Sequence, residues 1–188
     1  MAHSCYFKIM KRIIILILLL QIGVTKMVAQ NWNKISNKIE SCQRRLTDSS
    51  EKEYISYTKK YNKVRKKYHV FQDLDVNTLN DTIFILEMHG ESFESLTSTL
   101  WTRKDLLSYK CVQWDMHDFE KSKKPFFIKQ MIELSSQWNI EEIRKEEKFH
   151  SNFIPRSMVY LTRVIFSKKK SKIECIRFFD FDDVTYSL

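Results

Sequence analysis

The sequence predicts an α+β domain in which a mostly antiparallel sheet of about five strands carries helices on one face. Apolar residues recur every three or four positions at the start of residues 30–188 and again near position 130, which is helical spacing. Short runs of β-branched and aromatic residues predict strands in the middle of the chain and near its end. The expected order is α-α-β-β-β-α-α-β-β, and residues 30–188 suffice for one core.

Two helices are expected to open the domain. The first covers residues 31–46, and the second begins at Ser50, because Ser50 and Glu53 form a capping-box pair. The apolar stripe of the first helix is Trp32, Ile35, Ile39, Cys42 and Leu46. The stripe of the second helix is Tyr54, Tyr57, Tyr61, Val64 and Tyr68. Its basic residues fall on the opposite face, which favours a tyrosine core backed by a solvated surface over a stacking site for an anionic polymer.

The middle of the chain predicts three strands joined by short turns. They cover residues 82–88, 93–101 and 107–114, with turns at 89–91 and 103–105. Consecutive short strands with short connections predict an antiparallel meander.

The last third predicts two helices followed by a hairpin. A helix begins between Ser122 and Pro125, since proline is tolerated in the first turn, and it continues to Trp138. Asn139 with Glu142 repeats the capping pattern and predicts a short helix at residues 140–148. Strands at 158–166 and 173–181 then form a hairpin with a very basic tip.

The N-terminus has the pattern of an export signal. Residues 1–12 carry three basic residues and no acid, and a short apolar run follows at 13–20. We expect cleavage after Ala29; the alternative is an uncleaved anchor helix of about residues 10–29. Both place residues 30–188, a single domain, outside the cytoplasm, either periplasmic, secreted or membrane-anchored.

Composition excludes several classes of function. Gly90 is the one glycine of residues 30–188, so the chain lacks the loops that usually cradle phosphates, and we expect no cofactor. Residues 1–29 hold four basic residues and no acid, so their removal lowers the formal net charge from +9 to +5. This mild charge predicts no nucleic-acid partner and suits an acidic envelope. The candidate anion-binding residues are Lys59, Lys60, Lys63, Lys66, Lys67, Lys168, Lys169 and Lys170.

Three cysteines remain after residue 29. An exported domain can keep a disulfide, but an odd number leaves one thiol over. Two interpretations stay open: Cys42, Cys111 and Cys175 are buried reduced thiols, or Cys111 and Cys175 form one bridge between strands.

Histidines follow two of the predicted strands. His89 follows the first strand and His117 follows the third, and in a meander these ends share one edge of the sheet. With Glu91 or Asp118 they suit a zinc site with an open position, and with Asp115 they suit acid–base catalysis. Their spacing matches no zinc signature, so solvated loops are the alternative.

Four stretches and one junction carry a resemblance. They are Ile85–Gly90, Ser98–Trp101, Trp138–Glu147, Cys175–Phe178 and the Ala29-Gln30 junction. Together they resemble uncharacterised small exported proteins of Bacteroidota. The resemblance implies an envelope or secreted location, and it brings no activity, cofactor or catalytic residue.

The sequence therefore favours an exported, non-enzymatic binding or interaction domain of the cell envelope, whose partner is an unidentified envelope component or protein. Two alternatives stay open. One is a metal-assisted hydrolase that uses His89 and His117, and the other is a structural subunit anchored by an uncleaved N-terminal helix.

Overall fold

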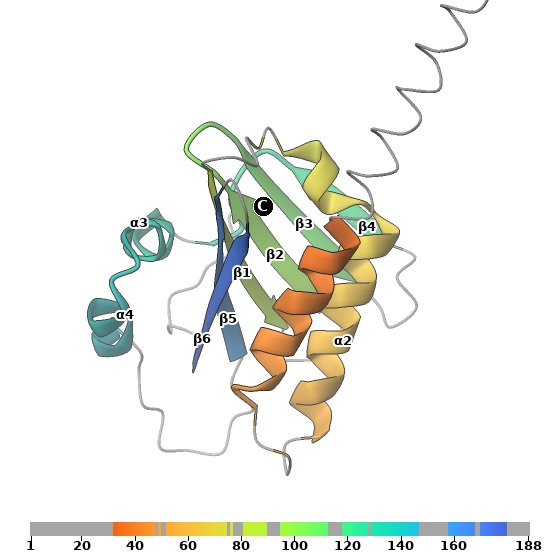
Figure 1. The fold of residues 1–188 in the computed structure, drawn as a ribbon, viewed down its shortest axis with the longest axis horizontal. Coiled ribbons are helices and arrows are strands. Elements are labelled where there is room, and N and C mark those ends of the chain that lie inside the picture. Colours follow the sequence, from red (N-terminus) through yellow and green to blue (C-terminus); the bar gives the residue numbers. More distant parts are fainter. Residues whose placement is uncertain are drawn as a thin grey trace, which may run out of the picture. The chain divides into compact units, whose positions relative to one another are not determined.

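The computed structural model describes most of the chain after residue 31 (Figure 1). The described residues are 32–47, 49, 52–74, 76, 81–89, 95–112, 118–127, 129–146, 158–167 and 170–179. The predicted signal segment thus lies outside them. The chain divides into two compact units, residues 1–35 and 36–188, and every described strand belongs to the second.

A six-stranded sheet forms the centre of the second unit. Its order is β4-β3-β2-β1-β5-β6, and every neighbouring pair is antiparallel. The strands are β1 (Thr82–His89), β2 (Ser95–Trp101), β3 (Leu106–Val112), β4 (Asp118–Ser122), β5 (Met158–Phe166) and β6 (Ser171–Phe179). The α+β class and the antiparallel sheet are confirmed.

The sixth strand is β4, at positions where the sequence predicted a loop and the start of a helix. Its charged sequence gives little apolar signal, but β3 pairs with it from Asp118 to Ser122. Phe119 supplies its inward contact, because its ring stacks on Tyr68 with centroids 3.7 Å apart. An edge strand needs hydrogen bonds to one neighbouring strand and little apolar surface. Its own sequence therefore does not identify β4 as a strand, and its pairing with β3 does.

Helices cover both faces of the sheet, and the expectation of helices on one face was wrong in this respect (Figure 1). On one face lie residues 36–44 of the helix 32–44 and α2 (Lys52–Lys67), followed by the 3₁₀ turn η1 (Val70–Asp73). On the other face lie α3 (Lys129–Gln137) and α4 (Ile140–Glu146).

The central strand explains why both faces need cover. Leu86 and Met88 of β1 pack against α3 and α4, whereas Glu87 points toward α2. All three side chains are fully buried, so no face of β1 is left to solvent. The continuous apolar run of β1 is typical of a strand covered on both sides.

A sharp corner joins α3 to α4. Trp138 has a φ of 56°, and the Asn139 amide donates back to the Leu134 carbonyl at 3.1 Å, which ends α3 with a left-handed residue. The guanidinium of Arg163 lies 4.2 Å from the Trp138 ring. The Asn139 side chain then accepts the Glu142 amide at 3.3 Å, which confirms the predicted cap.

A disulfide connects the helix 32–44 to the sheet. It joins Cys42 to Cys175 of β6, with Cα atoms 6.0 Å apart, and Cys111 is buried outside this bridge. One bridge and one left-over thiol are present, but the predicted Cys111–Cys175 pairing was wrong, and of the three thiols expected to be buried and reduced Cys111 alone is so. A Cys111–Cys175 bridge is impossible because β2, β1 and β5 separate β3 from β6, which is about 19 Å at the usual strand spacing.

The thiols provide a direct test of this pairing. Alkylation of the unfolded, unreduced chain is expected to label Cys111 and to spare Cys42 and Cys175, as peptide mass mapping would show. Reduction before alkylation is the control and should expose all three. Label on Cys42 without reduction, or a linked Cys111–Cys175 peptide, would contradict the assignment.

Candidate functional site

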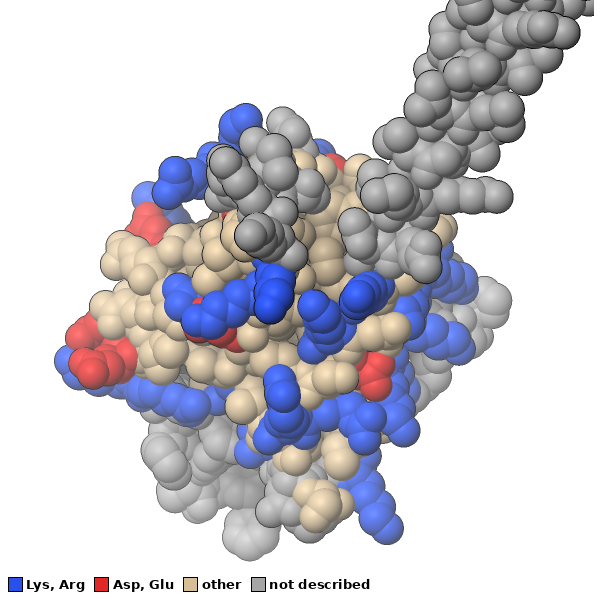
Figure 2. All heavy atoms as spheres, in the orientation of Figure 1, with Lys and Arg blue, Asp and Glu red and all other residues tan. Residues whose placement is uncertain are grey.

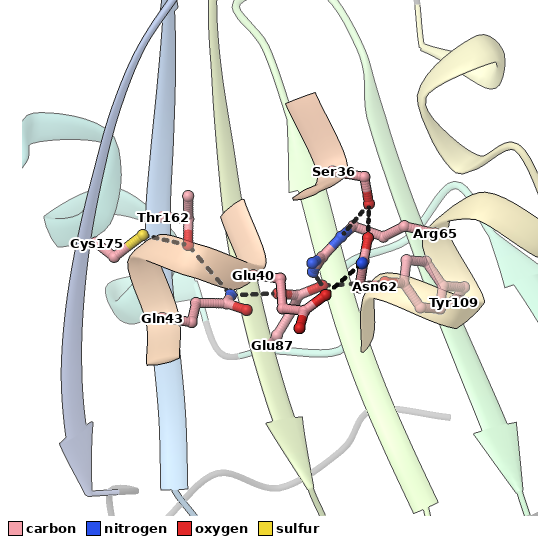
Figure 3. A network of polar contacts seen from close by, with 9 residues as sticks. All are labelled: Ser36, Glu40, Gln43, Asn62, Arg65, Glu87, Tyr109, Thr162 and Cys175. Carbon is pink, nitrogen blue, oxygen red and sulfur yellow. Dashed lines mark hydrogen bonds and ion pairs between the residues drawn. The ribbon is translucent and has the colours of Figure 1, made fainter. Parts of the chain in front are cut away.

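A buried carboxylate lies between the sheet and the helices 32–44 and α2 (Figure 3). Glu87 of β1 is fully buried, and three donors from different elements converge on it. Its Oε1 accepts Arg65 Nη1 of α2 at 2.5 Å and the Tyr109 hydroxyl of β3 at 3.2 Å. Its Oε2 accepts Gln43 Nε2 from the helix 32–44 at 2.6 Å. Glu87 therefore ties both helices to the centre of the sheet.

The same residues also join the two helices to each other. Arg65 Nε donates to the Ser36 hydroxyl at 3.1 Å, and that hydroxyl donates to Asn62 Oδ1 at 2.6 Å. Asn62 in turn donates to the carboxylate of Glu40. Residues 36–44 and α2 are thus fixed to each other by a chain of polar contacts that sequence spacing alone does not specify.

Polar contacts continue from Glu87 toward the disulfide. Gln43 Nε2 also lies 3.3 Å from the Thr162 hydroxyl of β5, and that hydroxyl donates to Cys175 Sγ at 3.5 Å. Cys42, the bridge partner, is adjacent to Gln43 in the sequence. One turn of the helix 32–44 therefore carries both the disulfide to β6 and the polar contacts of Gln43, which Figure 3 draws.

This network is built to hold charge, not to react with a solute. The side chains of Arg65 and Glu87 are both 0% exposed, so water and solutes do not reach them. A buried ion pair is favourable only when further hydrogen bonds satisfy it, and Tyr109, Gln43 and Ser36 supply three. Within the described part of the chain, Arg65 Nη2 and Gln43 Oε1 are buried without a hydrogen-bond partner. Its chemical role is to fix the helical layer.

Removing the carboxylate charge is expected to destabilise the fold strongly. Glu87→Gln should lower the free energy of unfolding by about 3–5 kcal/mol, because Arg65 would stay buried without a counter-charge. The double variant Arg65→Met with Glu87→Leu should recover most of that loss, since no charge is then buried. Urea denaturation with the disulfide intact measures both.

A partly exposed pair serves as the matched control. Arg163 and Glu174 also form an ion pair, but their side chains are 25% exposed. Glu174→Gln should therefore cost about 1 kcal/mol or less. Equal losses for Glu87→Gln and Glu174→Gln would rule out the special role of the buried pair.

The network also perturbs a tyrosine. Burial, and then the nearby charge of Glu87, raise the pKa of Tyr109 well above its ordinary value of 10.0. The unfolded chain releases this proton near pH 10 while the folded chain keeps it. The stability contribution is thus complete below pH 10 and is lost as pH rises from there toward the folded pKa.

Tyr109→Phe should reveal this linkage. At pH 7 it is expected to lower the free energy of unfolding by about 1–2 kcal/mol, because Glu87 loses a hydrogen bond. Above pH 10 the gap between the two proteins should narrow, since the phenylalanine variant lacks the titrating group. Denaturation series from pH 7 to pH 11 measure the gap, and a gap that stays constant would contradict the raised pKa.

The outer side of the same two helices is strongly basic (Figure 2). We call it the basic helical face. It consists of Lys38, Arg44, Arg45, Lys52, Lys59, Lys60, Lys63, Lys66 and Lys67. Of these, Lys60 and Lys66 are half-buried and the others are exposed. Figure 2, in the orientation of Figure 1, shows Lys and Arg gathered over these helices with few acidic residues among them.

The described tyrosines of α2 turn away from this face. Tyr57 and Tyr61 are buried, which confirms the prediction that they form a core stripe. Tyr68, one residue past the helix end, is stacked on Phe119. Residues 36–44 extend the face with Lys38, an exposed residue beside the apolar stripe that the sequence-based prediction did not include.

The predicted histidine site falls largely outside the described residues. His89 ends β1 and Asp118 begins β4, but their side chains are not described, and Glu91, Asp115 and His117 lie outside altogether. In the described part of the chain, no group of three or more His, Cys, Asp or Glu side chains is placed to hold a metal ion. The metal and catalytic assignments stay predictions.

The second predicted basic cluster lies at the turn between β5 and β6. Lys170 is exposed, and its carbonyl accepts the Ser167 amide at 3.1 Å, which closes the turn. Lys168 and Lys169 lie outside the described residues.

Comparison with known proteins assigns no family to this chain. This chain matches no protein family, no curated protein and no solved structure. Among the described helices, none has the length and apolar character needed to cross a bilayer.

Proposed function

We propose that this protein is an exported, non-enzymatic domain that binds an anionic component of the cell envelope through the basic helical face. One observation carries the proposal. Basic side chains gather on the outside of two helices, and a buried network centred on Glu87 holds the inside of those helices to the sheet. The charges therefore project from a rigid surface, which lowers the entropy lost on binding.

The described side chains of the two helices themselves include few acidic groups. Among the described side chains of residues 36–44 and α2, Glu40 is the one carboxylate. It accepts a hydrogen bond from Asn62 and lies 4.0 Å from Arg44. Most of the remaining cations thus face solvent together, and clustered like charges attract an oppositely charged partner and speed its approach.

The disulfide supports the exported location. Bridges such as Cys42–Cys175 persist in oxidising compartments and are rare in the cytosol. The N-terminal sequence, with basic residues before a short apolar run, independently favours export. The proposal holds whether the chain is cleaved after Ala29 or keeps residues 10–29 as an anchor.

Charge reversal on α2 tests the proposal. In the triple variant Lys59→Glu, Lys63→Glu, Lys67→Glu, association of the protein with the envelope fraction of its own cells is expected to fall at least tenfold. All three lysines are exposed, so their replacement leaves the core intact. Fractionation followed by quantitative immunoblotting measures the bound share at low salt.

A second triple variant controls for net charge. Arg103→Glu, Lys104→Glu and Lys124→Glu change the same number of exposed charges, away from the basic helical face. This variant should associate as the wild type does. Equal association of all three proteins would mean that the lysines of α2 only keep the protein soluble.

A further inference from the structure

We infer that the anionic component is the surface of a phospholipid bilayer, and that the basic helical face lies flat against its phosphate groups. This inference rests on the proposed function and names its partner. Four features support it: the extent of the face, the kind of cation it presents, the inward packing of its described rings, and the position of the chain's apolar segment.

The face is broad and extended. The exposed lysines of α2 run from Lys52 to Lys67, which is about 22 Å along the helix at 1.5 Å per residue. Residues 36–44 lie beside α2 (Figure 1), and Lys38 and Arg44 on them are exposed. One small anion cannot contact basic residues spread over this length. An extended anionic surface can contact them all at once.

The cations are mainly lysines. An ammonium group is a compact point charge on a flexible stem, whereas arginine forms two fixed hydrogen bonds with one phosphate or carboxylate. Lys59, Lys63 and Lys67 are spaced one turn apart and exposed, so each can reach a separate phosphate. Lipids move laterally, and their headgroups can therefore adjust to these positions without a fixed pattern on the protein.

The described rings on α2 are turned inward, which disfavours single-stranded nucleic acids as the partner. Single-stranded nucleic acids are bound by stacking bases on exposed aromatic rings in a basic groove. Tyr57 and Tyr61 are 1% and 0% exposed, and the Tyr68 ring is stacked on Phe119. Among the described side chains of this face, charge is thus the main means of recognition.

Exposed apolar side chains are also lacking among the described residues of the face, so the helices do not insert into the acyl region as amphipathic helices do. Each Lys or Arg near an anionic bilayer contributes about 1 kcal/mol, and this attraction decays within about 8 Å at physiological salt. Binding by several such residues is therefore firm at low salt and strongly weakened at high salt.

The chain's own apolar segment brings the domain near a bilayer. Residues 13–24 are apolar apart from Gln21 and Gly23, and twelve residues later the second compact unit begins at Ser36. If this segment is retained, it keeps the domain attached to the bilayer. If it is removed, the basic helical face must hold the domain there alone.

Vesicle binding tests the inference. The full chain, as processed by its own cells, is sedimented with phosphatidylcholine vesicles and with vesicles that contain about 30% phosphatidylglycerol, a composition chosen for its anionic charge. At 50 mM NaCl we expect at least tenfold more protein bound to the anionic vesicles. At 500 mM NaCl this difference should disappear.

Variants identify the surface. The triple variant at Lys59, Lys63 and Lys67 should lose the preference for anionic vesicles, and the triple variant at Arg103, Lys104 and Lys124 should keep it. Equal losses in both variants would overturn the assignment to the basic helical face. Salt-resistant binding to both kinds of vesicle would also overturn it, because the apolar segment would then account for the association.

The two proposals fail in different ways. If anionic vesicles bind no better than neutral ones while envelope association still depends on the α2 lysines, the lipid inference falls. The proposed function then stands, with an anionic polysaccharide or protein as the partner. If envelope association does not depend on those lysines either, both proposals fall.

Discussion

The ion pair between Arg65 and Glu87 is the constraint on which the arrangement of the helices depends. Moving two charges from water into the layer between helices and sheet costs several kcal/mol per ion, and attraction offsets this cost only when the geometry is good. Here Arg65 Nη1 lies 2.5 Å from Glu87 Oε1, and Gln43 and Tyr109 donate hydrogen bonds to the same carboxylate. A displaced helix would leave a buried charge without a partner, so the pair excludes alternative positions of the helical layer.

The disulfide acts at the same place by a different means. Cys42 precedes Gln43 on the helix, and Cys175 accepts a hydrogen bond from Thr162, which itself contacts Gln43. A bridge that closes a sequence separation of 133 residues restricts the unfolded chain, while the polar contacts specify the folded one. Because these contacts hold the inner side of the helices, the backbone of their outer face is rigid as well. Binding there thus requires little further ordering of the backbone.

The inner side of α2 stabilises the fold, and its outer side carries the lysines of the proposed binding surface. Arg65 turns inward and pairs with Glu87, while Lys63 and Lys67 turn outward and are exposed. Neighbouring residues of the same charge thus have opposite roles, decided by about 100° of helical rotation per residue. A mutation that weakens the inner side should disturb the outer one, but reversal of an outer lysine leaves the inner network intact.

The sequence by itself determined the features that depend on near neighbours. The stripe of α2, the cap at Asn139 and the limits of β5 follow from residues a few positions apart, because periodicity and capping are local. Tertiary structure alone decided the rest. The Arg65–Glu87 pair joins residues 22 positions apart, and the disulfide joins residues 133 apart. No local pattern marks such partners, since strand order selects them. The same order placed β4 at an edge and required helices on both faces of β1.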